Sequence, residues 1–285
     1  MVHILPAPAP TGADQMSPVR TAVPDRRLNL SVVTGPDWSL PGGPGLTSIE
    51  DACYVRTEVT KPREWIDHVD IHIALQQLVQ LSAWSPLGFE RVSAMHLRDP
   101  ERVLSGKKIG ERWSRVLTSA LPGPGGGSKP DFLFGYDDIG APGVRKWLDL
   151  RTEFNRGISA MTFGIGSRDA SLDGLLADCG IGLENVGYRL QVAQGVKGRR
   201  SHENHLRDIA REVQDVLPFK ATTWARDSAN MYNGIKHPDR QFDPPAQEMY
   251  GMLVKNRLVF RVWVARRLGV SDAVINRGMW RLQRG

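Results

Sequence analysis

The chain has 285 residues, of which 41% are hydrophobic and 24% are charged, values typical of a folded globular protein. No stretch approaches the roughly 20 apolar residues of a membrane-spanning helix, and the first 27 residues lack the pattern of a secretion signal. The two cysteines, Cys53 and Cys179, lie far apart, which excludes a disulfide framework and a zinc finger. We therefore expect a cytoplasmic protein that uses no membrane anchor, no metal ion and no cofactor.

The net charge of +6 is distributed unevenly along the chain. From Arg151 onward there are 21 Lys and Arg against 14 Asp and Glu, whereas residues 1–150 have 16 against 17. Clustered Lys and Arg supply the sequence-independent part of nucleic-acid affinity. The second half is therefore predicted to contact a phosphate-bearing partner, and a solvated basic face is the alternative.

The front part of the chain mixes strand and helix patterns. Residues 1–27 are rich in Pro and Ala and are predicted to be a disordered leader. The apolar patterns predict strands over 28–33, 54–59 and 89–97 and a helix over 65–84, with Gly- and Pro-rich loops at 41–45 and 121–128.

The second part is almost entirely helical in pattern. Apolar residues recur at helical spacing over 147–161, 172–190, 206–217, 222–237 and 249–268. The predicted fold class is therefore α+β. An irregular α/β N-terminal domain over 28–145 is followed by an all-α bundle over 146–285.

Most familiar catalytic motifs are absent from the sequence. The glycine-rich loop at 123–128 lacks the Gly-Lys-Ser/Thr ending of a phosphate-binding loop. His68 and His72 have a metal-binding spacing on the predicted helix, but no third ligand accompanies them, so no metal site is predicted. His202 and His205 lie in a polar stretch that we interpret as an exposed loop.

The helix predicted over 222–237 carries a polar stripe. Its members, at positions i, i+4, i+7 and i+11, are Arg226, Asn230, Asn233 and His237. Histidine is suited to move a proton near neutral pH, and Arg or Lys can hold a phosphate. The stripe predicts metal-independent RNA cleavage. The alternative is a solvent-exposed helix face whose terminal His interacts favourably with the helix dipole.

The segment around this stripe resembles a known family. Residues 224–240, WARDSANMYNGIKHPDR, resemble the signature helix of HEPN domains, in particular those of ApeA-type anti-phage proteins. Residues 132–138, 147–150 and 182–188 are similar to further landmarks of that family, and residues 73–79 are more loosely similar to its N-terminal domain. The resemblance covers most of residues 50–265.

The resemblance implies a helical bundle that forms a homodimer with one composite, metal-independent RNase site. Such enzymes leave a 2′,3′-cyclic phosphate, and ApeA-type proteins act on transfer RNA in abortive infection. By the resemblance, His237 transfers the proton, and Asn233 either orients the His237 side chain or donates to a phosphate. The further catalytic candidates are Lys236, Tyr232, Arg226 and Glu184. The candidates for RNA binding are Arg240, Asn230, Lys197, Arg199 and Arg200. Where the family motif has an arginine, this chain has Tyr232.

The sequence thus predicts an endoribonuclease effector of phage defence, whose front half senses, regulates or binds a phage-derived activator. One alternative is a non-catalytic HEPN module that binds RNA or oligomerises in a defence or toxin–antitoxin system. Another is a DNA-binding regulator that uses basic residues near the C-terminus, namely Arg261, Arg266, Arg267 and Arg281.

Overall fold

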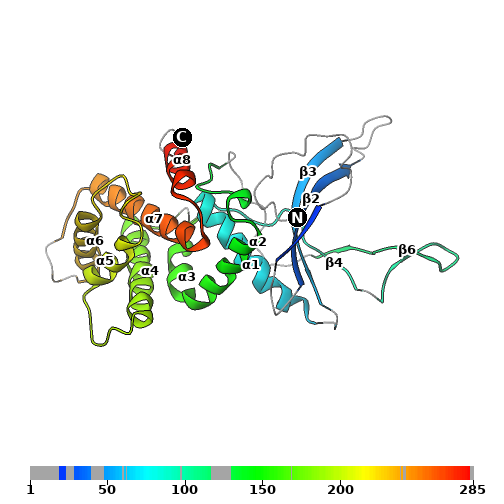
Figure 1. The fold of residues 1–285 in the computed structure, drawn as a ribbon, viewed down its shortest axis with the longest axis horizontal. Coiled ribbons are helices and arrows are strands. Elements are labelled where there is room, and N and C mark those ends of the chain that lie inside the picture. Colours follow the sequence, from blue (N-terminus) through cyan, green and yellow to red (C-terminus); the bar gives the residue numbers. More distant parts are fainter. Residues whose placement is uncertain are drawn as a thin grey trace. The chain divides into compact units, whose positions relative to one another are not determined.

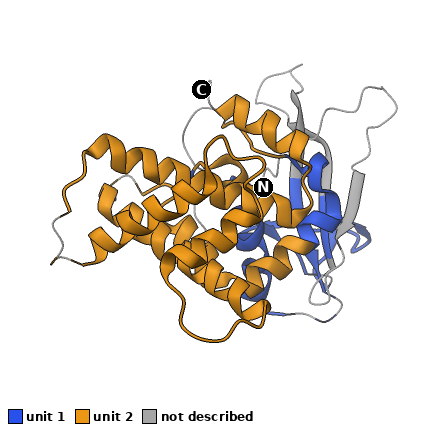
Figure 2. Ribbon diagram, turned by 60° about the vertical axis from the view of Figure 1, so that its left-hand side comes forward, with its two compact units in different colours: residues 1–79, 86–128, 135–145 blue, residues 80–85, 129–134, 146–285 orange. Residues whose placement is uncertain are grey.

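The computed structural model describes residues 19–23, 29–39, 48–59, 61, 63–96, 98–116, 130–167, 169–237, 239 and 242–282. Its helices and small antiparallel strand pairs confirm the α+β class. The chain divides into two compact units, shown in Figure 2. Unit 1 comprises residues 1–79, 86–128 and 135–145, and unit 2 comprises 80–85, 129–134 and 146–285. Compactness does not test where a domain folds independently, so the domain limits stay predictions.

Unit 1 contains a three-stranded antiparallel sheet with the order β1–β2–β3. The strands span Val19–Val23, Asn29–Ser39 and Ser48–Glu58. β1 lies within the predicted disordered leader, where its backbone pairs with β2 instead, and Val23 stands opposite Leu30. The rest of the leader lies outside the described residues. Leu30, Val32 and Val55 are buried, so the sheet contributes to an apolar core.

Helix α1, Trp65–Ala83, confirms the helix predicted over 65–84. The Thr57 hydroxyl on β3 lies 2.9 Å from His68 Nδ1 and 3.1 Å from His72 Nε2, which ties the sheet to this helix. Trp84 has a left-handed backbone (φ 49°), and this conformation ends α1 one residue earlier than predicted.

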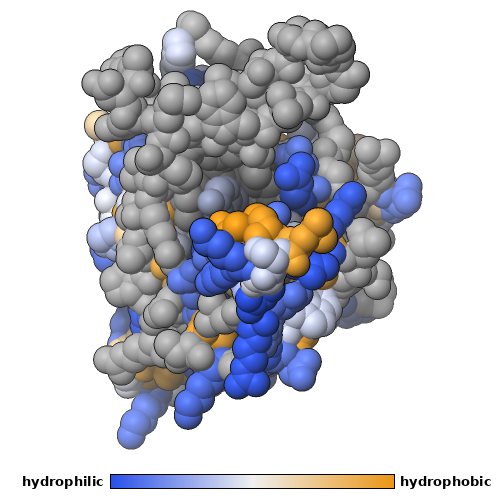
Figure 3. Space-filling view, turned by 90° about the vertical axis from the view of Figure 1, so that its right-hand side faces the viewer, coloured by the Kyte–Doolittle hydropathy of each residue, from blue (hydrophilic) through white to orange (hydrophobic). Residues whose placement is uncertain are grey.

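One long hairpin of unit 1 holds two nested strand pairs (Figure 1). β4 (Ser93–Ala94) pairs with β7 (Ser114–Arg115), and β5 (Glu101–Arg102) pairs with β6 (Lys108–Gly110). Of the described residues 89–96, within the strand predicted over 89–97, only Ser93 and Ala94 are therefore in a strand. At the tip of the β5–β6 hairpin, Leu104 is fully exposed, and Figure 3 shows an apolar patch among hydrophilic side chains on this face. The predicted loops at 41–45 and 121–128 lie outside the described residues.

The remaining helices follow in chain order. They are α2 (Tyr136–Glu153), α3 (Asn155–Phe163), α4 (Leu172–Ala193), α5 (His202–Arg211), α6 (Ala221–Lys236), α7 (Ala246–Leu268) and α8 (Asp272–Leu282). α2 contributes to both units and is kinked at Gly140. The helix predicted over 147–161 is interrupted at Phe154, between α2 and α3. The helix predicted over 206–217 is α5, which begins earlier because the Ser201 side chain caps it. α8 was not predicted.

Helix α4 is the hub of unit 2, since it contacts α3, α5, α6 and α7. Its buried apolar residues include Leu176, Leu183, Val186 and Leu190. Two glycines let neighbouring helices approach closely. A Cβ on Gly180 would lie 2.1 Å from the Tyr232 ring of α6, and one on Gly187 would lie 2.7 Å from the His205 backbone of α5. The positions of α5 and α6 against α4 therefore depend on these two glycines.

Candidate functional site

The polar stripe predicted from the sequence lies on α6. Arg226 and Asn230 are exposed, Asn233 is half-buried, and His237 is exposed at the C-terminal end of the helix. His237 leaves the helical conformation (φ −116°, ψ 96°), while its backbone N–H still donates to the Asn233 carbonyl at 3.1 Å. The imidazole is therefore presented to solvent from a backbone held by the last turn of the helix.

The opposite face of α6 is fixed against α7 by a buried polar contact. The Trp224 indole N–H and the Ser228 hydroxyl both donate to Asn256 Oδ1, at 2.9 and 2.8 Å. All three residues are buried. Because a buried donor without a partner is costly, these bonds oppose rotation of α6 about its axis. The side of the helix that carries His237 is thereby kept toward solvent.

Tyr232 occupies the place where the resembled motif has an arginine. The side chain is only 7% exposed, and its hydroxyl donates to Glu184 Oε2 on α4 at 3.4 Å. Burial, together with the nearby Glu184 carboxylate, raises the pKa of the Tyr232 phenol. Of the predicted catalytic candidates, the structure thus brings Glu184 and Tyr232 together inside the bundle, away from the exposed stripe.

His202 and His205 are buried in α5, so their interpretation as an exposed loop was wrong. The His202 ring centroid lies 4.7 Å from that of Tyr232, and neither ring nitrogen has a hydrogen-bond partner in the described part of the chain. Burial lowers the pKa of His202 to about 4. A cap signal was available in the sequence, because Ser201 stands three residues before Asn204, whose N–H the serine accepts.

Lys236 connects this buried cluster to the exposed end of α6. Its ammonium lies 5.4 Å from the centroid of the Tyr232 ring, a distance compatible with a cation–π contact. The lysine is exposed and directly precedes His237. Three helices therefore bring Glu184, His202, Tyr232 and Lys236 together, and Lys236 directly precedes the residue predicted to transfer a proton.

The front part of the chain identifies the family. Residues 27–148 match the family model of ApeA N-terminal domain 1. The chain thus carries an ApeA-type N-terminal domain, which supports an ApeA-type family. ApeA-type proteins are a family of anti-phage defence. Searches of curated proteins and of solved structures gave no match. The predicted resemblance to ApeA is confirmed by this match, whereas the HEPN identity of the helices beyond residue 148 stays a prediction.

The RNA-binding candidates lie in different surroundings. Lys197 and Arg199 are exposed in the segment between α4 and α5. Arg200 forms an ion pair with the buried carboxylate of Asp208. On α6, Asn230 is exposed. Arg226 of the same helix, a catalytic candidate, pairs with Asp227 at 3.0 Å. Arg240 lies outside the described residues. Lys197 and Arg199 are thus the two cations of this set whose structural placement favours contact with a partner.

The basic residues near the C-terminus are bound within the chain. Arg261 is buried and donates to the carbonyls of Leu81 and Ser82. The other three bind side chains or carbonyls of unit 2: Arg266 binds Asp215 and Asp272, Arg267 binds Glu212, and Arg281 donates to the Phe132 carbonyl. The DNA-binding alternative therefore relies on guanidinium groups that already have partners.

Two further properties of the chain concern the described residues only. Among them, no three His, Cys, Asp or Glu side chains gather as a set that could hold a metal ion. The helices that the structure describes include none long and apolar enough to cross a membrane. The His68–His72 pair stays a two-histidine arrangement around the Thr57 hydroxyl.

Proposed function

We propose that this ApeA-type protein is a metal-independent endoribonuclease of anti-phage defence that acts on RNA, with transfer RNA as the foremost substrate. The observation that carries the proposal is the exposed end of α6. There His237 stands free of the helix, Lys236 precedes it, and Asn233 lies one turn earlier on the same face. A proton-transfer group, a cation and an amide are therefore within one helical turn of each other.

The chemistry assigned to these groups is an internal transfer of the phosphodiester. His237 removes the proton from a ribose 2′-hydroxyl, and the oxygen attacks the adjacent phosphorus. The bond from phosphorus to the 5′-oxygen breaks, and this oxygen takes up a proton as it leaves. Lys236 stabilises the negative charge that grows on the phosphate oxygens. The products are a 2′,3′-cyclic phosphate and a 5′-hydroxyl, so the step needs no metal ion.

We further propose that the protein acts as a cytoplasmic homodimer. Pairing through unit 2 would bring the His237 end of α6 toward the same end in a second copy, so that one imidazole serves as base and the other as acid. The ApeA N-terminal domain is then the part on which a phage-derived activator acts. This division of labour agrees with the match of residues 27–148 to that domain.

The test is RNA cleavage in EDTA, with a transfer RNA pool and three full-length proteins. Wild type is expected to produce 2′,3′-cyclic ends, and His237→Ala is expected to lose roughly 10²- to 10⁴-fold in rate, the usual contribution of general acid–base catalysis. Thr223→Ala is the matched control, because Thr223 is also an exposed polar residue of α6 but lies at its other end. Full activity of His237→Ala would contradict the site assignment.

A second function, a non-catalytic RNA-binding or oligomerisation module, is favoured by one observation. The residue in the arginine position, Tyr232, is buried against Glu184 and supplies no cation beside His237. In that case wild type and His237→Ala bind RNA equally and neither cleaves it, even after addition of extract from phage-infected cells. Cleavage that appears only with infected extract supports a latent enzyme instead.

A further inference from the structure

The segment between α4 and α5, residues 194–200, is held in one conformation by buried side chains of both helices; we call it the α4–α5 loop. We propose that this loop binds the backbone phosphates of RNA, and that Gln191 and His205 are positioning residues that hold it for this task. The inference rests on the proposed function, since it assigns the contact through which unit 2 grips its substrate.

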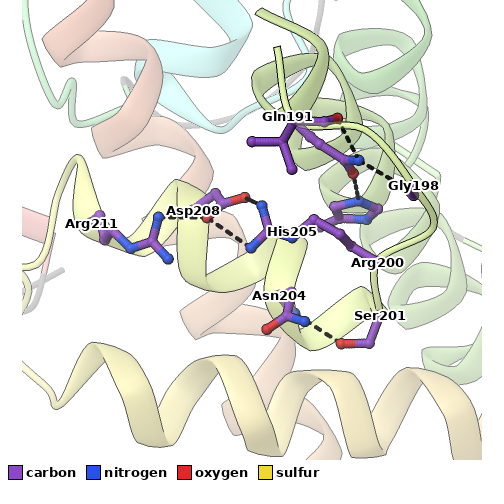
Figure 4. Close-up of polar contacts among 9 residues, drawn as sticks. Gln191, Gly198, Arg200, Ser201, Asn204, His205, Asp208 and Arg211 are labelled. Carbon is purple, nitrogen blue, oxygen red and sulfur yellow. Dashed lines mark hydrogen bonds and ion pairs between the residues drawn. The ribbon is translucent and has the colours of Figure 1, made fainter. Parts of the chain in front are cut away.

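The first observation is a clamp on the loop backbone (Figure 4). Gln191, at the end of α4, donates from its side-chain amide to the carbonyls of Val196 at 3.1 Å and Gly198 at 2.8 Å. Its amide oxygen lies 2.9 Å from His205 Nε2 on α5. One glutamine thus joins the loop to both flanking helices.

The roles in this clamp follow from chemistry. Carbonyl oxygens only accept hydrogen bonds, so the amide nitrogen of Gln191 must face Val196 and Gly198. The amide oxygen then faces His205, whose Nε2 must carry the hydrogen that it donates. Gln191 and His205 are only 3% and 5% exposed. A buried amide with all of these bonds made holds the loop firmly, because any other loop conformation leaves polar groups unpaired.

A second tie fixes the end of the loop. The buried Asp208 carboxylate binds Arg200, and Arg211 lies 2.7 Å from the other side of the same carboxylate (Figure 4). Ser201 then caps α5 by accepting from the Asn204 N–H at 3.3 Å. Arg200 therefore serves to anchor the loop, which leaves Lys197 and Arg199 as its phosphate-binding cations.

The charge and location of the loop indicate an anionic partner beside the proposed active site. Residues 192–200 contain no acidic residue. Arg199 stands three residues before His202, so their Cα atoms are about 10 Å apart at most. The His202 ring centroid lies 4.7 Å from that of Tyr232. Tyr232 in turn lies under Lys236, next to His237. A polyanion that reaches His237 can therefore also lie along the loop.

The first experiment measures binding of a labelled transfer RNA pool to full-length protein at several salt concentrations, with His237→Ala present throughout to prevent cleavage. Adding Lys197→Gln and Arg199→Gln is expected to weaken binding roughly tenfold at low salt and to make the log–log salt slope shallower by roughly 1.5, because two phosphate contacts are lost. Lys220→Gln with Arg156→Gln is the matched control, since both cations are exposed elsewhere in unit 2. An unchanged slope in the loop variant overturns the proposal.

The second experiment tests the positioning role. Gln191→Met keeps the length of the side chain but releases the loop carbonyls, and it is expected to raise KM severalfold while kcat stays near wild type. In the Lys197→Gln/Arg199→Gln background the same substitution is expected to have no further effect on RNA affinity. An effect that persists there overturns the positioning role, because it would arise from general damage to the fold.

These outcomes separate the two proposals. If wild type cleaves RNA but the loop variant shows an unchanged salt slope of binding, the loop assignment is refuted and the proposed ribonuclease activity is still supported. Loop-dependent RNA binding without cleavage under any condition supports the loop and refutes the enzyme.

Discussion

Two buried titratable residues of unit 2, Arg261 and His202, differ in how many hydrogen bonds their side chains form. Arg261 on α7 donates to two carbonyls at the end of α1, and its guanidinium lies 5.9 Å from the Trp84 ring. His202 on α5 lies against Tyr232, with neither ring nitrogen bonded within the described residues. The first is a structural tie, since two of its nitrogens donate to backbone carbonyls. The second carries unmatched polar atoms beside the proposed site.

This difference indicates which buried polar residues serve function and which serve stability. Burying a polar group without a partner costs stability, so folded proteins rarely retain one for packing alone. Burial also lowers the pKa of Arg261 to about 10, yet its bonds to Leu81 and Ser82 keep it in place. His202 departs from this rule, because it is buried against Tyr232 with neither ring nitrogen bonded within the described residues, and Lys236 lies over the same tyrosine ring. Unfolding measurements on substituted proteins test this contrast.

The largest effect is expected at the arginine. Arg261→Met leaves the Leu81 and Ser82 carbonyls buried without their donor, which should lower the free energy of unfolding by about 3 kcal/mol. Urea unfolding measures this loss. Arg267→Met serves as the control, because Arg267 is partly exposed and its partner Glu212 can turn to water. If the two variants are equally stable, the buried tie contributes nothing special.

A smaller loss is expected on the histidine side. Gly180→Ala places a Cβ 2.1 Å from the Tyr232 ring and must displace it, which should cost about 2 kcal/mol. The matched control is Gly251→Ala on α7, where the added Cβ meets no atom within 4 Å. Thermal unfolding compares the two. Equal melting temperatures would mean that the ring moves aside freely and that the cluster is loosely packed.

Replacing the unmatched histidine should increase stability. His202→Phe keeps a ring against Tyr232 and removes two unbonded nitrogens, so a gain of about 1 kcal/mol is expected at pH 7. In the wild type the pKa of His202 is about 4 when folded, below its ordinary value of 6.5. The unfolded chain therefore binds a proton first as the pH falls, and stability is lost between pH 6.5 and 4.

The variant should accordingly show a shallower loss over this range than wild type, measured by urea unfolding at several pH values. Both proteins keep His72, whose burial also lowers its pKa to about 4, as a common background. An identical pH dependence in the two proteins would show that His202 finds a bonding partner in solution.

The smallest effect is expected at Tyr232. Tyr232→Phe removes one long hydrogen bond to Glu184, at 3.4 Å, and should cost about 0.5 kcal/mol. The cleavage rate should change far less than in His237→Ala, since the hydroxyl faces α4. A hundredfold loss of cleavage would instead place this hydroxyl in the reaction.

The sequence predicted the parts of the fold that show as a periodic residue pattern within a single helix. Apolar periodicity located α1, α4 and α7, and the polar stripe of α6 was visible from spacing alone. Glu184, one of the predicted catalytic candidates, does contact α6, through the Tyr232 hydroxyl. These features depend on local spacing, which a single sequence displays.

The features that were missed depend on pairs of elements. His202 and His205 stand in a polar segment, and their burial follows from packing against α6 and from Gln191, which is 14 positions away on another helix. β1 forms because β2 offers it a paired edge. Local composition cannot reveal such partners.

The Thr57 hydroxyl, which lies between His68 and His72, restricts which ring nitrogens carry a hydrogen. A hydroxyl group has one hydrogen, so Thr57 can donate to only one of the two imidazoles at 2.9 and 3.1 Å. The other ring must carry its own hydrogen on the facing nitrogen and donate it to Thr57. Because the facing nitrogens are Nδ1 of His68 and Nε2 of His72, two neutral rings share one tautomer, Nε2–H if Thr57 donates to His68 and Nδ1–H if it donates to His72. A metal ion entering there would have to displace a hydrogen from this shared arrangement.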